Sequence, residues 1–281
     1  MNDTLREYCS YGQFILPLLK VKKQITPQKI QWGNKHQYFL DYAAACPISS
    51  TLVIYIHGGG WNSGSPKDFH FIGQHIALEG YDCIMPGYRK SPKYHYEDIV
   101  DDIFAGFVHI RNHLATHARN YDKIIVMGSS AGAHLGALLC FDTQMQRQFQ
   151  IPPDTFSGFI SLAGPLCFDF PQTGTLNILL KDLFGTKNKA SWKKGDPLSK
   201  LRQNVPTKTL LIQSSHDGLV GYEQAKHFLE QLTALGIPAA LTDVPEKQNT
   251  HSAYSAGIFL KNKSQSPTLR IIFDWLYQET H

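Results

Sequence analysis

The sequence of 281 residues predicts an α/β fold, with a mostly parallel sheet of about eight strands and helices on both of its faces. Short, continuous apolar runs recur along the chain, as expected for strands buried on both faces. Segments of helical character alternate with these runs, which is the order of β-α units. Two alternating stretches around Gly33 and Asn34 indicate an antiparallel hairpin at the start of the sheet, in residues 29–42.

The remaining elements follow this hairpin in a regular order. Strands are expected at residues 52–56, 82–85, 123–127, 157–162, 209–213 and 239–244. Helices are expected at residues 69–78, 97–114, 131–141, 222–235 and 268–277. Carboxylates at Asp98, Asp101 and Asp102 stand in the early turns of the second helix, where they favour the helix dipole. Gly236 is a typical residue just beyond the end of the fourth helix.

Residues 164–206 depart from this alternation. The stretch "LNILLKDLFG" places four leucines, at positions 176, 179, 180 and 183, on one helical face. Two interpretations stay open: a helix packed on the core, or part of a small lid or cap over a pocket. The densest basic stretch, residues 187–194, is interpreted as a solvated loop. We expect one domain, residues 1–281, that includes this small lid.

Composition and charge exclude several classes of protein. Hydrophobic residues make up 42% and charged residues 18%, which predicts an ordinary folded core rather than disorder. The formal net charge of +4 is too small and too dispersed to indicate a nucleic-acid partner. The apolar run at residues 14–19 is short and contains Pro17, so it is not typical of a signal peptide. No apolar run approaches membrane-spanning length, so no membrane partner is expected.

The cysteines favour a cytoplasmic location. Their number is odd, no C-x-x-C spacing occurs, and they stand at positions 9, 46, 83, 140 and 167. Reduced thiols are the simplest interpretation, and neither a metal site nor a disulfide framework is indicated. The sequence leaves the oligomeric state open.

Residues 128–132, "GSSAG", fit the G-x-S-x-G pattern between a predicted strand and a predicted helix. A strand-to-helix turn this tight strains the central residue and presents its side chain at the carboxyl edge of the sheet. The positive end of the helix dipole lies beneath that side chain. We therefore predict that Ser130 is a nucleophile, and a plain glycine-rich turn is the alternative.

Residues 57–60, "HGGG", follow a buried strand and therefore reach the same edge of the sheet. Glycines let a substrate approach the backbone N–H groups without obstruction by side chains. Gly58 and Gly59, with the N–H of Ala131 after the nucleophile, are predicted to form an oxyanion hole. The sequence does not decide which of the three glycines at 58–60 donate.

A nucleophilic serine needs a base and an orienting acid. His251 lies in a polar loop after the last strand, where it can reach the carboxyl edge of the sheet. Asp217 directly follows a buried strand, one helix and one strand before that loop. The order Ser, Asp, His is the one found in α/β enzymes with this serine turn. Asp217 would fix the tautomer of His251 and stabilise the imidazolium, and Asp243 and Glu246 are the rival acids.

The neighbouring residues are given binding or structural roles. Trp61 and Gly60 are expected to line the substrate pocket. His57 is expected to hold the glycine loop by hydrogen bonds rather than to act as the base. The remaining candidate bases are disfavoured by their places on helices, beside the acid or at the end of the chain, and are His134, His216, His227 and His281.

The segments "HGGGW", "GSSAG" and "HDGLV" with a late loop histidine, in this order, resemble the α/β-hydrolase superfamily. More narrowly they resemble the hormone-sensitive-lipase-like and BD-FAE-like carboxylesterases, a group close to the kynurenine formamidases. "PGYRKSP" and "LFGTKNKASWKKGDPLSKL" are similar to further segments of that group, so the resemblance covers roughly residues 25–280.

The resemblance implies hydrolysis of small carboxylic esters, with Ser130, Asp217 and His251 as the triad and with no metal or organic cofactor. The polar segment before His251 departs from relatives that carry a glycine there. Two alternatives stay open: an arylformamidase that cleaves N-formylkynurenine, and a non-catalytic binding module built on a hydrolase fold.

Overall fold

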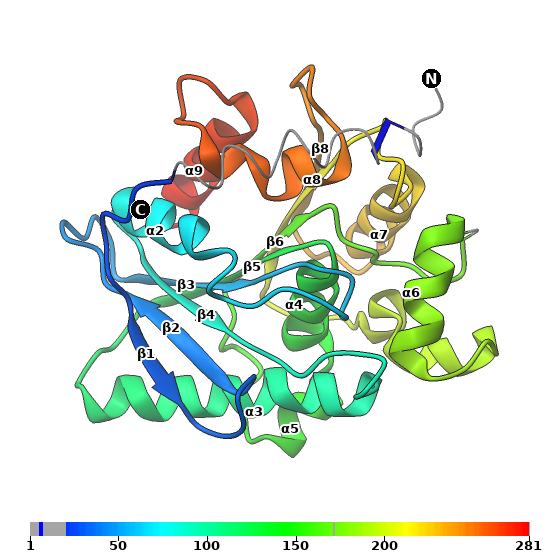
Figure 1. Ribbon diagram of the computed structural model, residues 1–281, viewed down its shortest axis with the longest axis horizontal. Coiled ribbons are helices and arrows are strands. Elements are labelled where there is room, and N and C mark those ends of the chain that lie inside the picture. The colour runs from blue at the N-terminus through cyan, green and yellow to red at the C-terminus, as the bar shows by residue number, and fades with distance from the viewer. Residues whose placement is uncertain (1–5, 8–20, 171, 281) are drawn as a thin grey trace.

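The computed structural model describes residues 6–7, 21–170 and 172–280 (Figure 1). Cys9 and the apolar run at residues 14–19 therefore lie outside the described residues. The structure contains one sheet with the strand order β1-β2-β4-β3-β5-β6-β7-β8. The strands are β1 (Gln28–Gln31), β2 (Tyr38–Tyr42), β3 (Thr51–Ile56), β4 (Asp82–Pro86), β5 (Lys123–Ser129), β6 (Gly158–Leu162), β7 (Lys208–Gln213) and β8 (Ala239–Asp243).

The predicted fold is confirmed. Strands β1 and β2 form the antiparallel hairpin, and β2 also pairs antiparallel with β4. All other neighbours in the sheet are parallel. Because parallel strands end at the same edge, the segments that follow β3, β5 and β7 are brought close together, as functional residues of such sheets usually are.

The described helices include every helix that the sequence predicts and two short ones that it does not, α5 and α8. They are α2 (His70–Leu78), α3 (Tyr96–Thr116), α4 (Ala131–Phe141), α5 (Thr143–Gln148), α6 (Gly174–Phe184), α7 (Tyr222–Ala234), α8 (His251–Ser255) and α9 (Pro267–Thr280). Within the described residues there are also three 3-10 helices: η1 (Lys189–Gly195), η2 (Pro197–Lys200) and η3 (Gly257–Leu260).

The interpretation of residues 187–194 as a solvated loop was wrong in part. This stretch contains most of η1, and the ring of Trp192 is buried beneath it. The indole N–H of Trp192 donates to the carbonyl oxygen of Thr186 at 3.0 Å. The buried ring of Trp192 anchors the backbone of η1 to the core. The lysines of residues 187–194 therefore form the exposed side of this packed element.

Both faces of the sheet carry a hydrophobic core. Every residue of β3 is buried, and its side chains alternate between the two faces. Leu52 and Ile54 pack on the side of α3 and α4, whereas Val53 packs on the side of α2 and α9. Figure 1 shows these two pairs of helices on opposite sides of the sheet.

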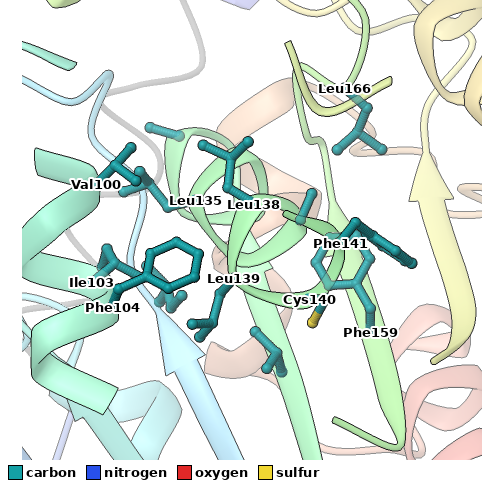
Figure 2. Close-up of a cluster of buried hydrophobic side chains, with 14 of the residues drawn as sticks. Val100, Ile103, Phe104, Leu135, Leu138, Leu139, Cys140, Phe141, Phe159 and Leu166 are labelled. Atoms are coloured by element: carbon teal, nitrogen blue, oxygen red, sulfur yellow. The ribbon is translucent and has the colours of Figure 1, made fainter. Parts of the chain in front are cut away.

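Helix α4 is buried along its entire length. In Figure 2 its side chains Leu135 and Leu139 lie next to Ile103 and Phe104 of α3. Full burial of each such side chain contributes about 1.5–3 kcal/mol, so α4 is firmly anchored. The residue at its N-terminus is therefore held in one position relative to the sheet.

Neither a membrane span nor a metal cluster is found in the part of the chain that the structure describes. No helix there is both long and apolar enough to cross a bilayer. Nor do three or more His, Cys, Asp or Glu side chains gather there in a way that could hold a metal ion.

Candidate active site

Ser130 occupies the sharp turn between β5 and α4. Its backbone has φ 52° and ψ −120°, a conformation that non-glycine residues rarely adopt and that stores strain. A Cβ atom at Gly132 would lie 2.0 Å from the carbonyl oxygen of Ile56, and one at Gly128 would lie 2.3 Å from that of Gly132. Only glycine fits at these two positions, which explains the spacing of the motif.

The structure brings the side chains of Ser130, Asp217 and His251 together at the carboxyl edge of the sheet. His251 Nε2 lies 2.8 Å from Ser130 Oγ, and His251 Nδ1 lies 2.8 Å from Asp217 Oδ2. The three residues follow β5, β7 and β8 respectively, and both His251 and Asp217 are buried. This chain of contacts can move a proton from the hydroxyl to an imidazole whose other nitrogen is held by a carboxylate.

One local expectation was wrong, because His251 begins helix α8 rather than lying in a loop. Helix α8 has only five residues, too few to show a helical periodicity in the sequence. Thr250 stands at the N-cap position of α8, where threonine is a preferred residue type. This threonine is the signal in the sequence that could have revealed the helix.

Five hydrogen-bond donors surround the carboxylate of Asp217. They are the backbone N–H groups of Leu219 and Val220 on Oδ1, and the side chains of His251, Tyr254 and Gln213 on Oδ2. The contact from Tyr254 is the shortest, at 2.5 Å. Sequence reasoning missed Tyr254, although it stands three residues after His251 and so shares a helix face with it.

The rival acids have other partners. Asp243 accepts a hydrogen bond from the backbone N–H of Ser215 at 2.9 Å. Glu246 accepts hydrogen bonds from Ser266 and Thr268 and thereby satisfies the start of α9. Of the three candidate acids, Asp217 is therefore the one that contacts the imidazole of His251.

The environment raises the pKa of His251 above its ordinary value. Burial alone would lower this pKa, but the charge and the hydrogen bond of Asp217, with a smaller effect of the Glu7 charge, outweigh it. Burial, assisted by the negative charge of Asp217, raises the pKa of Tyr254 well above its usual range. Tyr254 therefore keeps its proton and donates a hydrogen bond to Asp217.

The glycine loop passes close to the nucleophile. A Cβ atom at Gly58 would lie 3.3 Å from the Cβ of Ser130 and 2.8 Å from the carbonyl oxygen of Ser129. Gly59 and Gly60 both have positive φ, at 111° and 58°, which favours glycine at each position. The backbone at Gly58 therefore lies beside the side chain of Ser130.

The prediction for His57 is confirmed. Its Nδ1 lies 2.7 Å from the carbonyl oxygen of Gly58, and its Nε2 lies 3.2 Å from Lys90 Nζ. The ring is stacked on Tyr88 and is fully buried. Burial, reinforced by the charge of Lys90, lowers the pKa of His57, so a neutral imidazole holds the glycine loop.

The expectation that Trp61 lines the pocket was wrong. Its side chain is only 1% exposed and does not belong to the cavity wall. The indole N–H instead donates to His134 Nδ1 at 3.2 Å, and His134 Nε2 lies 2.8 Å from the carbonyl oxygen of Gly195. Trp61 therefore packs the loop against α4, and His134 has a structural role.

A cavity of about 390 Å³ opens beside Ser130. Its wall includes Gly58, Gly60, Ser130, Leu179, Leu219 and His251. Of the two interpretations of residues 164–206, burial of the leucines supports the helix packed on the core, and the lid stays a prediction. Three of the four leucines, Leu176, Leu180 and Leu183, are buried in the core, whereas Leu179 faces the cavity. A Cβ atom at Gly60 would lie 2.9 Å from Leu179, so α6 closes directly over the glycine loop.

The comparisons with known proteins agree with this fold. The family model BD-FAE matches residues 42–232. The probable carboxylic ester hydrolase LipM of Mycobacterium tuberculosis is 24% identical over 75% of this chain and 50% of its own length. Esterase LipQ of the same organism is 23% identical over 75% of this chain and 52% of its own length. The chain spans about half the length of these curated relatives.

Solved structures share the whole fold. Esterase B from Lactobacillus rhamnosis superimposes with a TM-score of 0.75 at 18% sequence identity, covering 99% of this chain and 94% of that one. A truncated carbohydrate esterase from gut microbiota gives a TM-score of 0.77 at 16% identity, covering 93% and 99%. At these identities the likeness establishes the α/β-hydrolase fold.

Proposed function

Because the chain belongs to the BD-FAE family of α/β hydrolases, we propose that it is a serine carboxylesterase that hydrolyses small carboxylic esters. One observation carries this proposal: His251 lies 2.8 Å from both Ser130 Oγ and Asp217 Oδ2, beside a cavity. A nucleophile, a base and an orienting acid in hydrogen-bond contact are what acyl transfer to a serine requires.

In the acylation step, His251 Nε2 takes the proton of Ser130 as Oγ attacks the ester carbonyl carbon. The tetrahedral intermediate collapses, the bond to the alkoxy oxygen breaks, and the alcohol leaves with the proton from His251. Asp217 accepts the Nδ1 proton of His251 in a hydrogen bond throughout, which fixes the tautomer and stabilises the imidazolium.

In the deacylation step, His251 takes a proton from water, and the hydroxide formed attacks the acyl-enzyme carbonyl. The bond to Ser130 Oγ breaks, Oγ regains a proton from His251, and the carboxylic acid leaves. The proposal uses no metal or organic cofactor, because Ser130 supplies the nucleophile and His251 carries out every proton transfer.

The backbone N–H groups of Gly58, Gly59 and Ala131 are proposed to stabilise the negative oxygen of both intermediates. The close approach of Gly58 to Ser130 supports this role, as does the place of Ala131 at the start of α4. Loss of one such donor typically costs about 2.7–4 kcal/mol of transition-state stabilisation.

We also propose a single domain over residues 1–281, in which residues 164–206 include a small lid. Leu179 supports the lid, because it lines the cavity and contacts Gly60. Small-molecule esters are the proposed substrates, because about 390 Å³ is near the lower limit of typical ligand pockets. A cytoplasmic location remains a prediction.

The size of the cavity predicts a preference for short acyl chains. Across p-nitrophenyl esters of increasing acyl length, kcat/KM is expected to peak at short chains and to fall for long ones. Leu179→Ala is expected to move the optimum to longer chains. The ratio of kcat/KM for a long-chain ester to that for a short-chain ester is expected to rise by roughly 10-fold. Ile178→Ala is the matched control, because Ile178 is 61% exposed on the same helix.

The same set of substrates tests the alternatives. A preference of several orders of magnitude for N-formylkynurenine over every ester would replace the esterase proposal by an arylformamidase. Absence of both ester turnover and fluorophosphonate labelling of Ser130 in folded protein would instead favour a binding module.

The pKa of His251 predicts the pH dependence of the reaction. Only the neutral imidazole accepts the proton of Ser130, so activity is lost as pH falls through this pKa. Because the pKa is raised above 6.5, the acid limb of kcat/KM is expected to have its midpoint above that value. A kcat/KM profile from about pH 5 to 9 measures this midpoint in the free enzyme, and a value below 6.5 would contradict the prediction.

A further inference from the structure

Glu7 contacts the two segments that carry Asp217 and His251. Its Oε1 accepts the backbone N–H of His251 at 2.6 Å and that of Gly218 at 3.2 Å. Glu7 is buried and forms part of the cavity wall, although 244 residues separate it from His251. Figure 1 shows residues 6–7 as a short dark-blue segment near α8.

Arg6 holds the same region from a second side. Its guanidinium donates to the side chain of Asn249 and, at 3.4 Å, to the carbonyl oxygen of Lys247. Both acceptors lie in the segment that leads into α8. We call Arg6 and Glu7 with these contacts the N-terminal clasp.

The contact to His251 fills a specific structural need. The first N–H groups of a helix have no acceptor within the helix, and the side chain of Thr250 provides none here. His251 is buried, so its N–H needs a protein acceptor. Glu7 supplies that acceptor from the other end of the sequence.

The contact of Glu7 with Gly218 also constrains the segment that carries Asp217. Gly218 directly follows Asp217, in the loop after β7, whereas His251 follows β8. One oxygen atom of Glu7 therefore joins the loop after β7 to the start of α8, and the relative position of these two segments sets the distance between Asp217 and His251. An error of about 1 Å in such a distance can cost about 100-fold in rate.

We propose that Glu7 is a positioning residue of the active site, which holds the loop of Asp217 and the start of α8 in register for catalysis. This inference rests on the proposed esterase function. The charge of Glu7 has a second effect, because it favours the imidazolium that forms on His251. Among the described residues, the charged groups that act on the pKa of His251 are Asp217 and Glu7, while its Nε2 contacts the hydroxyl of Ser130 and its ring lies edge-on to that of Tyr254.

Two variants of Glu7 separate the hydrogen bonds from the charge. Glu7→Ala removes both, and kcat is expected to fall about 100-fold with a much smaller change in KM. Glu7→Gln keeps an oxygen that can accept both N–H groups, so most of kcat is expected to return. Without the negative charge, the pKa of His251 falls, and the acid limb of kcat/KM moves to lower pH.

Glu223→Gln is the matched control, because its side chain is 65% exposed on α7, where it pairs with Lys226. Kinetics on a short p-nitrophenyl ester are measured for all variants, and circular dichroism checks that each is folded. Full kcat in Glu7→Ala, or equal losses in Glu7→Ala and Glu7→Gln, would overturn the proposal.

An NMR titration of the His251 imidazole gives a readout that needs no substrate. The pKa of His251 is expected to be lower in Glu7→Gln than in the unaltered protein, and an unchanged pKa would overturn the proposal. If the unaltered protein hydrolyses no ester, the esterase proposal fails, but the titration still tests the contact of Glu7 with His251.

Discussion

Replacement of Ser130 by alanine is expected to lower kcat by about a million-fold, by analogy with the loss of the serine in other triads. The variant lacks the oxygen that forms the bond to the acyl group, and among the contacts described that oxygen is hydrogen-bonded to His251. Steady-state kinetics on a short p-nitrophenyl ester measure the loss of kcat. Labelling of the protein by a fluorophosphonate probe should also disappear in this variant.

The adjacent serine provides the control. Ser129 Oγ accepts a hydrogen bond from Tyr55 at 2.7 Å and donates to the carbonyl oxygen of Ser255. These buried contacts engage its hydroxyl, so Ser129→Ala is expected to cost about 1 kcal/mol of stability and little of kcat. A Ser129→Ala variant that loses labelling, with Ser130→Ala still labelled, would reverse the assignment of the nucleophile.

The parts of the site that follow from local pattern could be predicted from the sequence. The run of β3 is buried on both faces, so its composition alone identifies a central strand. Gly128 is required by contacts within one turn of Ser130, and such a short-range constraint appears as a fixed spacing, whereas Gly132 is required because Ile56 at the end of β3 lies close to it. Asp217 and His251 could be placed because parallel strands end at one edge.

The features that depend on side-chain direction or on distant contacts could not be predicted. Trp61 has a positive φ of 60°, which turns its ring into the core, and nothing in "HGGGW" encodes that angle. Glu7 and His251 are 244 positions apart in the sequence, so no local pattern indicates their contact. Tyr254 was missed because helix α8 is too short to be recognised from periodicity.

Replacement of Asp217 by asparagine is expected to lower kcat about 10,000-fold, as the same change does in other triads. Every hydrogen-bond partner named above for Asp217 is a donor. An asparagine must direct its NH₂ group either at the N–H groups of Leu219 and Val220 or at Tyr254 and His251. In the second orientation, His251 loses the acceptor that fixes its tautomer, and its Nε2 no longer accepts the proton of Ser130.

The first orientation is costly as well, because it leaves buried donors facing one another, at about 1–3 kcal/mol for each unsatisfied group. Asp217→Asn is therefore expected to lose stability in urea as well as kcat. Asp243→Asn is the matched control, because Asp243 ends the neighbouring strand and accepts only a backbone N–H from Ser215 among the contacts described. Equal kcat losses in the two variants would assign the effect to folding, whereas a loss confined to Asp217→Asn follows from the loss of its carboxylate as the acceptor for His251.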